Sequence, residues 1–210
     1  MRCFTVIAMP AALALALALA GCTSSRESSP RRTATEQLLI SKAADEAAAR
    51  LTLPLPKGAR VFVDAGNFEG TDGKYAIGAI RDRLLELGAR LAPERSAADI
   101  VVEIRAGALS VDEHKTLFGI PESEVPVPLT GDFTFPEIAL FKRDERLGIA
   151  KFAATAYDAK EGRLIGTTEP RFGFSYRRKW VVLLFVSWTT DNLIPKSADE
   201  GPPEGLEMLY

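Results

Sequence analysis

Apolar and polar side chains alternate along residues 99–109, which is the pattern of a β-strand. Ile100, Val102 and Ile104 fall on one side of this segment, and mostly charged residues fall on the other. The alternation therefore predicts a strand with one buried face. Residues 60–65 (RVFVDA) contain the apolar run VFV, and we predict a second, short buried strand there.

The C-terminal half of the chain carries the pattern of a β-hairpin. Residues 149–157 predict a strand, residues 158–162 a turn, and residues 163–168 the returning strand. Gly162 suits the positive φ that such a turn requires. We therefore expect neighbouring antiparallel strands here.

Two further segments near the C-terminus favour strands. Residues 172–176 place an aromatic side chain at every second position. The run at 181–186 (VVLLFV) is apolar throughout, and we predict that it is a buried core strand. The alternative for this run is a surface that meets a membrane or a partner. After Pro195 the tail is acidic and rich in proline and glycine, which predicts fraying.

Two amphipathic helices are also predicted. Thr33 and Glu36 have the spacing of a capping box, and the helix that follows runs to about Leu51. Its apolar positions recur every three or four residues and are Leu39, Ile40, Ala43, Ala44, Ala47 and Ala48. Residues 75–87 predict a second helix, which Gly88 ends.

The glycine-rich segment 66–74 links a predicted strand to a predicted helix, as phosphate-binding loops do. The spacing does not fit such a loop. Phe68 stands where the first glycine is required, and Tyr75 replaces the final serine or threonine. We therefore expect a loop that leads into the helix and binds no phosphate.

Together these elements predict an α+β domain, a mostly antiparallel sheet with two helices packed on it. Residues 110–146 do not fit this scheme easily, because the segment is long and contains four prolines. Its length and proline content predict a functional loop or an extended strap over the body of the domain.

The N-terminus has the features of a secretory signal. Residues 4–20 carry no charge and follow Arg2. The tetrapeptide LAGC at residues 19–22 resembles the lipobox of bacterial lipoproteins, in which the signal is cut between Gly21 and Cys22 and the cysteine carries lipid. A retained transmembrane helix is the alternative, although the apolar stretch is at the lower limit of the length that a span requires.

These features divide the chain into a signal at 1–21, lipidated Cys22 with a Ser-rich tether at 22–32, a single domain at 33–196 and a tail at 197–210. The predicted partner of the anchor is the lipid bilayer, because two or more acyl chains make anchoring stable. The chain has two cysteines. Cys3 leaves with the signal and Cys22 is blocked, which excludes disulfides and thiol chemistry in the exported domain.

The charge balance narrows the classes of partner. The chain carries 26 lysines and arginines and 28 acidic residues, for a net charge of −2. This balance does not favour nucleic acid as a partner. Nothing in the composition or the motifs indicates a cofactor.

His114 is the only histidine, and it lies in the charged segment DEHK. It is a candidate catalytic base for a nucleophile such as Ser110, or a metal ligand together with Asp112 and Glu113. Because no nucleophile-elbow motif accompanies it, we favour a solvated histidine. Three acidic residues in the proline-rich stretch are also expected to be solvated: Glu122, Glu124 and Asp132.

Trp180, Leu184 and Trp188 are the candidates for a membrane or partner contact. They lie within and beside the apolar run, directly after the basic residues 177–179. Tryptophan beside basic residues is typical of contacts at a membrane interface. The run is too short to cross a bilayer as a helix.

The segment RTATEQLL behind a lipobox and a tether resembles an uncharacterised family of bacterial lipoproteins. The similar pieces are residues 65–87, ADIVVEIRAGAL, LFGIP and AYDAKEGRLIG. The pattern is more loosely similar to surface-exclusion and secretion-associated envelope lipoproteins, and that resemblance implies self-association. Neither resemblance implies an activity.

We therefore expect a lipid-anchored protein of the cell envelope, placed in the outer membrane and facing the periplasm or the surface. Its expected role is non-catalytic, as an interaction or structural module. The alternatives are an oligomeric membrane-associated component and an envelope hydrolase that uses residues 110–146. An exposed apolar segment at 181–188 would favour the oligomer, and a polar cleft near His114 would favour the hydrolase.

Overall fold

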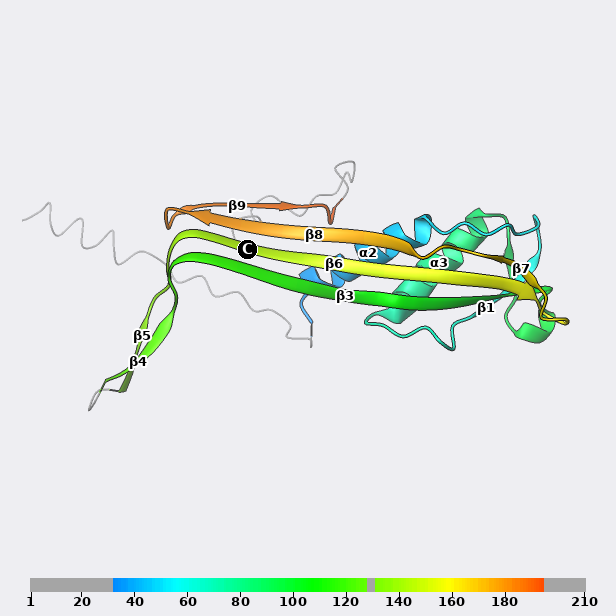
Figure 1. Ribbon diagram of the computed structural model, residues 1–210, viewed down its shortest axis with the longest axis horizontal. Coiled ribbons are helices and arrows are strands. Elements are labelled where there is room, and N and C mark those ends of the chain that lie inside the picture. Colours follow the sequence, from blue (N-terminus) through cyan, green and yellow to red (C-terminus); the bar gives the residue numbers. More distant parts are fainter. Residues whose placement is uncertain (1–31, 128–130, 195–210) are drawn as a thin grey trace, which may run out of the picture. The chain divides into compact units, whose positions relative to one another are not determined.

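The computed structural model describes residues 32–127 and 131–194, and for residues 125–133 it describes no side chains (Figure 1). The helices are α2 (Ala34–Ala49) and α3 (Gly73–Glu86), with a short 3-10 helix at Arg95–Ala97. The strands are β1 (Arg60–Asp64), β2 (Arg90–Leu91), β3 (Ile100–Ile120), β4 (Ser123–Val127), β5 (Gly131–Phe135), β6 (Ile138–Asp158), β7 (Leu164–Thr167), β8 (Arg171–Val182) and β9 (Val186–Asp191). The predicted signal, Cys22 and the tail lie outside the described residues.

The main sheet has the strand order β2-β1-β3-β6-β8-β9, and β7 pairs with β6. β2, β1 and β3 are parallel, and the remaining pairs are antiparallel. A separate two-stranded sheet joins β4 to β5. The chain is thus an α+β protein in which two helices pack on a mostly antiparallel sheet, as the sequence predicts.

Helix α2 begins where the capping box predicts. The Thr33 hydroxyl accepts a hydrogen bond from the Glu36 amide at 3.2 Å. All six apolar positions that the spacing predicts for this helix are buried. The small alanines let α2 lie very close to β6 and β8. A Cβ atom added at Gly173 would stand 2.0 Å from the Ala43 carbonyl oxygen, and one at Gly148 would stand 2.5 Å from that of Leu39.

Helix α3 starts two residues earlier than the sequence predicts, at Gly73. Asp72 precedes it in the left-handed conformation, with φ of 58°. Gly88 follows the helix with φ of 90°, which confirms its predicted role as the stop. Ile80 and Leu84 are buried, as the periodicity predicts.

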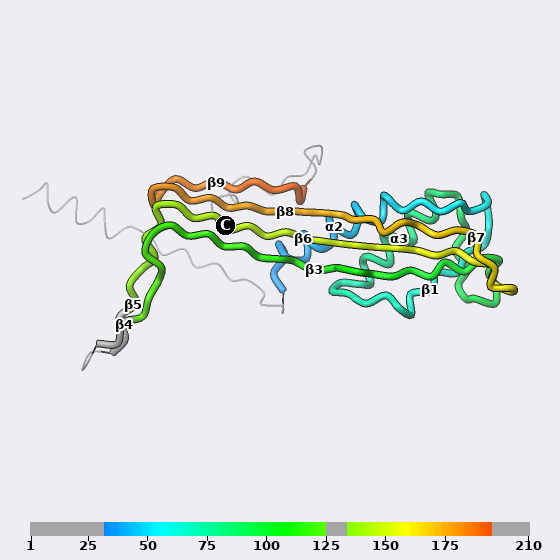
Figure 2. The backbone as a smooth tube through the Cα atoms, viewed as in Figure 1, coloured from blue at the N-terminus to red at the C-terminus, as the bar shows by residue number. Residues whose placement is uncertain are grey.

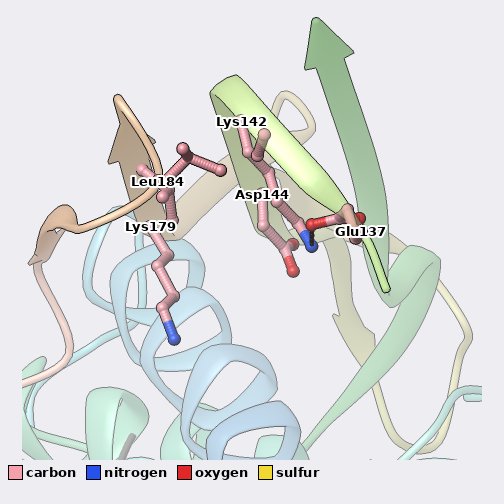
Figure 3. Close-up of a pocket in the computed structure, with 7 residues that line it drawn as sticks. Glu137, Lys142, Asp144, Lys179 and Leu184 are labelled. Carbon is pink, nitrogen blue, oxygen red and sulfur yellow. Dashed lines mark hydrogen bonds and ion pairs between the residues drawn. The ribbon is translucent and has the colours of Figure 1, made fainter. Parts of the chain in front are cut away.

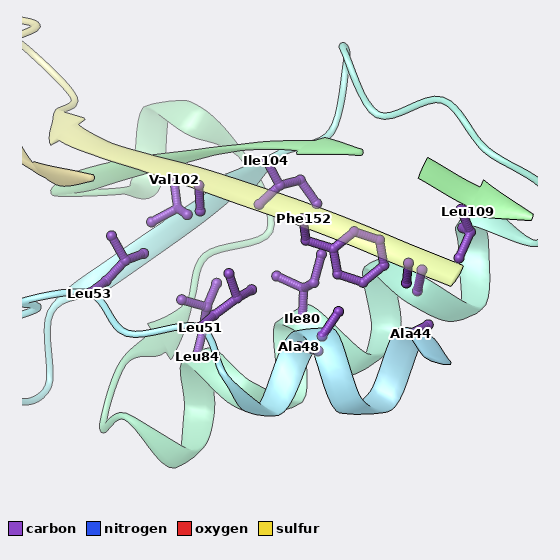
Figure 4. Packing of buried hydrophobic residues seen from close by; sticks show 14 of the residues in the cluster. Ala44, Ala48, Leu51, Leu53, Ile80, Leu84, Val102, Ile104, Leu109 and Phe152 are labelled. Atoms are coloured by element: carbon purple, nitrogen blue, oxygen red, sulfur yellow. The ribbon is translucent and has the colours of Figure 1, made fainter. Parts of the chain in front are cut away.

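The core lies between these helices and one face of the sheet (Figure 4). Phe152 on β6 is fully buried at its centre, and its ring lies 5.4 Å from that of Phe68. On β3, Ile104 and Leu109 both reach the core although their numbers differ by five. A bulge between Ala106 and Ala108 inserts the extra residue that allows this. The core is contained within the chain from Thr33 on, which forms one compact unit.

The prediction of a long loop at residues 110–146 is wrong. β3 and β6 are each 21 residues long and pair along nearly their whole length, so most of this segment is strand (Figure 2). The four prolines all lie between Ile120 and Ile138, in and around the short β4–β5 hairpin. Proline therefore interrupts only the far end of the two strands, because it cannot donate to a central ladder.

The prediction of a core strand at 181–186 is also wrong. β8 ends at Val182, β9 begins at Val186, and the residues between them form the turn. Leu183, Leu184 and Phe185 are exposed, and Phe185 retains 81 % of its accessible surface. No helix among the described residues is both long and apolar enough to span a membrane.

Candidate functional site

Helix α2 covers only part of the sheet that β3, β6 and β8 build. Beyond its N-terminus these strands and β9 continue with no helix over either face, as far as the described residues go (Figure 1). We call this part the open sheet and define it as residues 112–120, 138–147, 177–182 and 186–191. Arg177 still reaches the helix, where it donates to the Thr35 hydroxyl at 3.0 Å. Because α2 leaves the other positions uncovered, both faces of the open sheet offer side chains to solvent or to a partner.

The far end of the open sheet is rich in exposed apolar side chains. We call this group the apolar tip; its members are Phe118, Ile120, Leu140, Leu183, Leu184, Phe185 and Val186. Strand register brings them together, because Phe118 pairs with Phe141, Phe141 with Val182, and Val182 with Val186. Single exposed apolar residues are ordinary, whereas a group from several strands at one place is typical of contact surfaces and makes the tip a candidate for one.

The β8–β9 turn has an unusual backbone. Leu183 and Leu184 have φ of 51° and 73°, a left-handed conformation that non-glycine residues rarely adopt. Two hydrogen bonds hold this conformation: the Leu183 amide donates to Leu140 O at 2.9 Å, and the Leu184 amide donates to Ala139 O at 3.1 Å. The turn is thus fastened to β6 and presents its apolar side chains outward at a cost in local strain.

Both tryptophans lie directly behind the apolar tip. Trp180 on β8 and Trp188 on β9 form a cross-strand pair, with rings stacked at 6.1 Å between centroids. Phe141 approaches Trp180 at 6.0 Å, and the Arg143 guanidinium lies 5.0 Å from the centre of the Trp180 ring. The structure therefore brings Trp180, Leu184 and Trp188 to one end of the sheet, as the predicted contact requires.

Glu145 is the most buried charged residue of the open sheet, at 9 % exposure. The guanidinium groups of Arg143 and Arg178 both donate hydrogen bonds to its carboxylate. The Arg178 hydrogen bond, followed by that of Arg143, lowers the pKa of Glu145 below its usual value. Arg178 also lies 4.6 Å from the centre of the Tyr176 ring. This carboxylate is held ionised between two cations, which suits a structural ion cluster better than a proton carrier.

A small cavity lies close to the tip, on the face of the open sheet opposite to Glu145 and Trp180 (Figure 3). Its volume is about 230 Å³, below the roughly 300–1,000 Å³ of common ligand sites. Lys142 donates to Glu137 at 2.6 Å within it, while Asp144, Lys179 and Leu184 complete most of the wall. Because two lysines balance two carboxylates there, the cavity offers no strong preference for an anion or a cation.

The predicted candidates around His114 do not converge. His114 pairs in register with Glu145 and Asp112 with Leu147, whereas Glu113 points to the other face. There, Glu113 accepts from Arg146 at 3.0 Å and contacts Lys115 at 3.2 Å. Among the described residues, no group of three or more possible ligands is placed to hold a metal ion.

Ser110 and His114 do not form a nucleophile–base pair in this arrangement. They are four residues apart on one extended strand, which places them roughly 13 Å from each other along it. Both are exposed. Glu122 and Glu124 are exposed as expected, and the side chain of Asp132 lies outside the described part of the chain.

A wider, open groove of about 740 Å³ lies between the starts of α2 and α3. Its walls include Leu38, Tyr75, Ser41 and Lys74. The Tyr75 hydroxyl donates to Asp45 at 3.1 Å, and burial raises the pKa of both groups. The Ser41 hydroxyl in its wall donates to Leu38 O of its own helix at 3.2 Å. At the start of α3 the groove carries the carboxylate of Asp72, which opposes binding of a phosphate.

The sequence alone did not single out several residues of the candidate surface. Phe118, Leu140, Arg143 and Glu145 lie within the segment expected to be a loop. Residues 138–147 (IALFKRDERL) do not alternate, because an apolar run is followed by five charged residues, so the sequence carries no period-2 signal of a strand here. The strand becomes evident only from its pairing with β8.

Comparison with known proteins gives a family but no activity. No curated protein matches the chain. The model of a family of unknown function, DUF6655, matches residues 16–169. The match covers both helices and the strands through β7, and it ends before β8 and β9. Since the matched residues make up more than half of the chain, the chain belongs to the family of unknown function DUF6655.

Proposed function

We propose that this protein is a non-catalytic component of the bacterial cell envelope, anchored by lipid on Cys22, whose folded domain makes a second contact with the bilayer through the apolar tip. One observation carries this proposal: seven exposed apolar side chains gather at the end of an uncovered sheet. A surface of this kind favours an apolar environment over water.

The chemistry behind the tip suits a bilayer interface. Trp180 and Trp188 stack there, and tryptophan is enriched where hydrocarbon meets headgroups. Four cations lie nearby, Lys142, Arg143, Arg178 and Lys179, together with three carboxylates, Glu137, Asp144 and Glu145. Since the excess of positive charge is only one, anionic headgroups should strengthen binding modestly and apolar burial should supply most of it.

The turn is well suited to this role. Its backbone amides at Leu183 and Leu184 already donate to carbonyl groups of β6, so entry into an apolar layer leaves these two amides paired. Phe185 is the most exposed residue of the tip, so its ring is the most accessible to a bilayer. A short, pre-shaped apolar turn of this kind can enter the interface without refolding.

Two weak contacts together hold a protein on a membrane better than either does alone. We propose that the acylated cysteine supplies one and the tip supplies the other. The outer membrane, with the domain facing the periplasm or the surface, is the proposed location. Thr23 after the cysteine supports it, because retention in the inner membrane of many Gram-negative bacteria favours aspartate there.

The test uses the chain from Thr33 on, which contains the complete core and lacks Cys22. This chain is mixed with phosphatidylcholine vesicles, with or without phosphatidylglycerol, and floated through a density gradient. We expect the unaltered chain to float with the vesicles, and the pair Leu184→Asp and Phe185→Asp to abolish flotation.

The matched control is Leu164→Asp on β7. Leu164 is 61 % exposed, which is comparable to the 56 % exposure of Leu184. Leu164 lies far from the tip, however, because β7 pairs with the other end of β6. This variant should float like the unaltered chain. Failure of the unaltered chain to float with either vesicle, or equal flotation of all three proteins, would rule the second membrane contact out.

A further inference from the structure

We infer that copies of this protein join edge to edge, with β9 of one copy pairing antiparallel to β3 of the next in a register that sets Trp188 opposite Phe118. The partner is therefore a second copy of this chain. This inference does not rest on the membrane contact proposed above, since it is carried by the edges of β3 and β9, and Phe118 is the only residue of the apolar tip that it uses.

Two edges of the open sheet are unpaired in the described part of the chain. β1 pairs with β3 only as far as Glu103, so from Ile104 to Ile120 β3 has β6 on one side alone. β9 has β8 on one side alone, and all six of its residues are exposed. Each edge presents a row of backbone donors and acceptors that can pair with another strand.

The directions of the two edges are compatible. β3 is antiparallel to β6, β6 to β8, and β8 to β9. β9 therefore runs antiparallel to β3. A second copy in the same orientation can therefore place its β3 beside β9, and the strand directions then continue to alternate as they do from β3 to β9 within one copy. The contact is heterologous, because it joins two different edges, and it leaves one free edge at each end for further copies.

Natural proteins usually protect an edge of this length with proline, bulges or rows of lysine. β9 (VSWTTD) contains no proline and no lysine. Residues 108–117 of β3 pair with β6 without a bulge and contain no proline. The one lysine among them is Lys115, which the register below places opposite Asp191. These two regular edges, ten and six residues long, are therefore not blocked against pairing by proline or by a bulge.

The side chains favour one register. Within one copy, strand pairing sets Val186 level with Phe118 and Asp191 level with Glu113. Direct pairing at this level would bring two carboxylates together, which is unfavourable. A shift of two residues instead sets Asp191 opposite Lys115, Thr190 opposite Thr116 and Trp188 opposite Phe118. It converts a repulsion into an ion pair and joins two exposed aromatic rings.

The experiment is disulfide crosslinking of the full-length protein in bacterial membranes. Thr116→Cys and Thr190→Cys are introduced together, and oxidised membranes are run on a non-reducing gel. Within one copy these positions are separated by β6 and β8, or roughly 14 Å, which exceeds the reach of a disulfide. We expect dimers and larger species that disappear on reduction, with at least half of the protein crosslinked.

Controls separate the edge contact from other thiol chemistry. Proteins with only one of the two introduced cysteines should give no dimers or larger species. These variants keep the native cysteines and therefore show whether the native thiols crosslink by themselves. The pair Thr116→Cys and Thr189→Cys directs the two thiols to opposite faces and should stay monomeric. In the pair His114→Cys and Thr190→Cys, the two thiols would face each other only if the strands paired without the two-residue shift, so this pair should crosslink less.

Three results would overturn the inference. The first is a Thr116→Cys and Thr190→Cys protein that remains monomeric in membranes. The second is a crosslink formed by Thr116→Cys alone, which would indicate a two-fold contact between like edges. The third is preferential crosslinking of the His114→Cys and Thr190→Cys pair. None of these results depends on whether the lipid-free chain floats with vesicles, so the two proposals fail separately.

Discussion

The Ser175 hydroxyl donates a 2.6 Å hydrogen bond to the carbonyl oxygen of Leu39, and both residues are fully buried. This bond ties β8 to α2 close to Gly148 and Gly173, where the helix approaches the sheet. It also marks the boundary of the core, since the open sheet begins just beyond it. The close approach rests on residues without large side chains, and it is therefore sensitive to a single methyl group.

Gly173→Ala should lower the free energy of unfolding by about 1–3 kcal/mol, because the new methyl group would meet the Ala43 carbonyl oxygen and the helix backbone would have to move. Gly78→Ala in α3 is the matched control. A Cβ atom there meets nothing within 4 Å, so this change should stabilise the protein by about 0.5–1 kcal/mol. Urea unfolding of both variants checks the pair, and similar values for the two would contradict the close packing.

Glu145→Gln should make the free energy of unfolding depend less on pH in the acid range. The pKa of Glu145 is lower in the folded protein than in the unfolded chain, because Arg178 and Arg143 donate to its carboxylate. Its contribution to stability is therefore complete above the unfolded pKa and disappears as the pH falls through the folded pKa. Glutamine does not titrate, so the difference in unfolding free energy between the two proteins should narrow below about pH 5.

Chemical denaturation at a series of pH values measures this difference. At pH 7 the variant should be less stable by on the order of 1 kcal/mol, because two guanidinium groups lose their shared anion while keeping partial contact with solvent. A difference that stays constant from pH 7 to the acid range would show that the ion cluster does not form.

Leu184→Asp should leave the domain folded. Leu184 is exposed, and aspartate tolerates the left-handed backbone that this position adopts better than leucine does. The free energy of unfolding should stay within about 0.5 kcal/mol of the parent value. Circular dichroism during thermal unfolding checks this, and loss of cooperative unfolding would restore the core strand that the sequence suggested.

The sequence predicted the parts of the fold that burial determines. The stripe Leu39, Ala43 and Ala47 faces the core as its spacing requires, and residues 99–109 alternate as a strand does. The extent of β3 and β6 could not be predicted in this way. In the open sheet these strands carry charged residues on both faces, and cross-strand pairs such as Glu113 with Arg146 replace burial as the stabilising contact.

The apolar run at 181–186 shows a different limit. Hydrophobicity indicates that a side chain avoids water, but it does not say whether the protein core or another surface will cover it. A turn built on Leu183 and Leu184 lacks the glycine, asparagine or aspartate that announces most tight hairpins. The sequence therefore named Trp180, Leu184 and Trp188 as a possible contact but left the core strand as the preferred prediction, and strand pairing with Phe118 at the same end favours the exposed surface.

Cys22→Ser should abolish lipid attachment. The lipobox at residues 19–22 predicts acylation of this thiol, and Cys3 is expected to leave with the signal. Metabolic labelling with an alkyne fatty acid checks it: the parent protein should be labelled and the variant should not. An unlabelled parent, or a variant that is still labelled, would contradict the predicted anchor.

The most direct measurement of the membrane contact uses the two native tryptophans, both of which lie beside the apolar tip. The chain from Thr33 on is mixed with vesicles that contain brominated lipids, and its tryptophan emission is recorded. If the tip enters the bilayer, the emission shifts to shorter wavelength and is quenched, and the Leu184→Asp and Phe185→Asp pair removes both effects. Emission that is unchanged by brominated vesicles would contradict the membrane contact on which the proposed function rests.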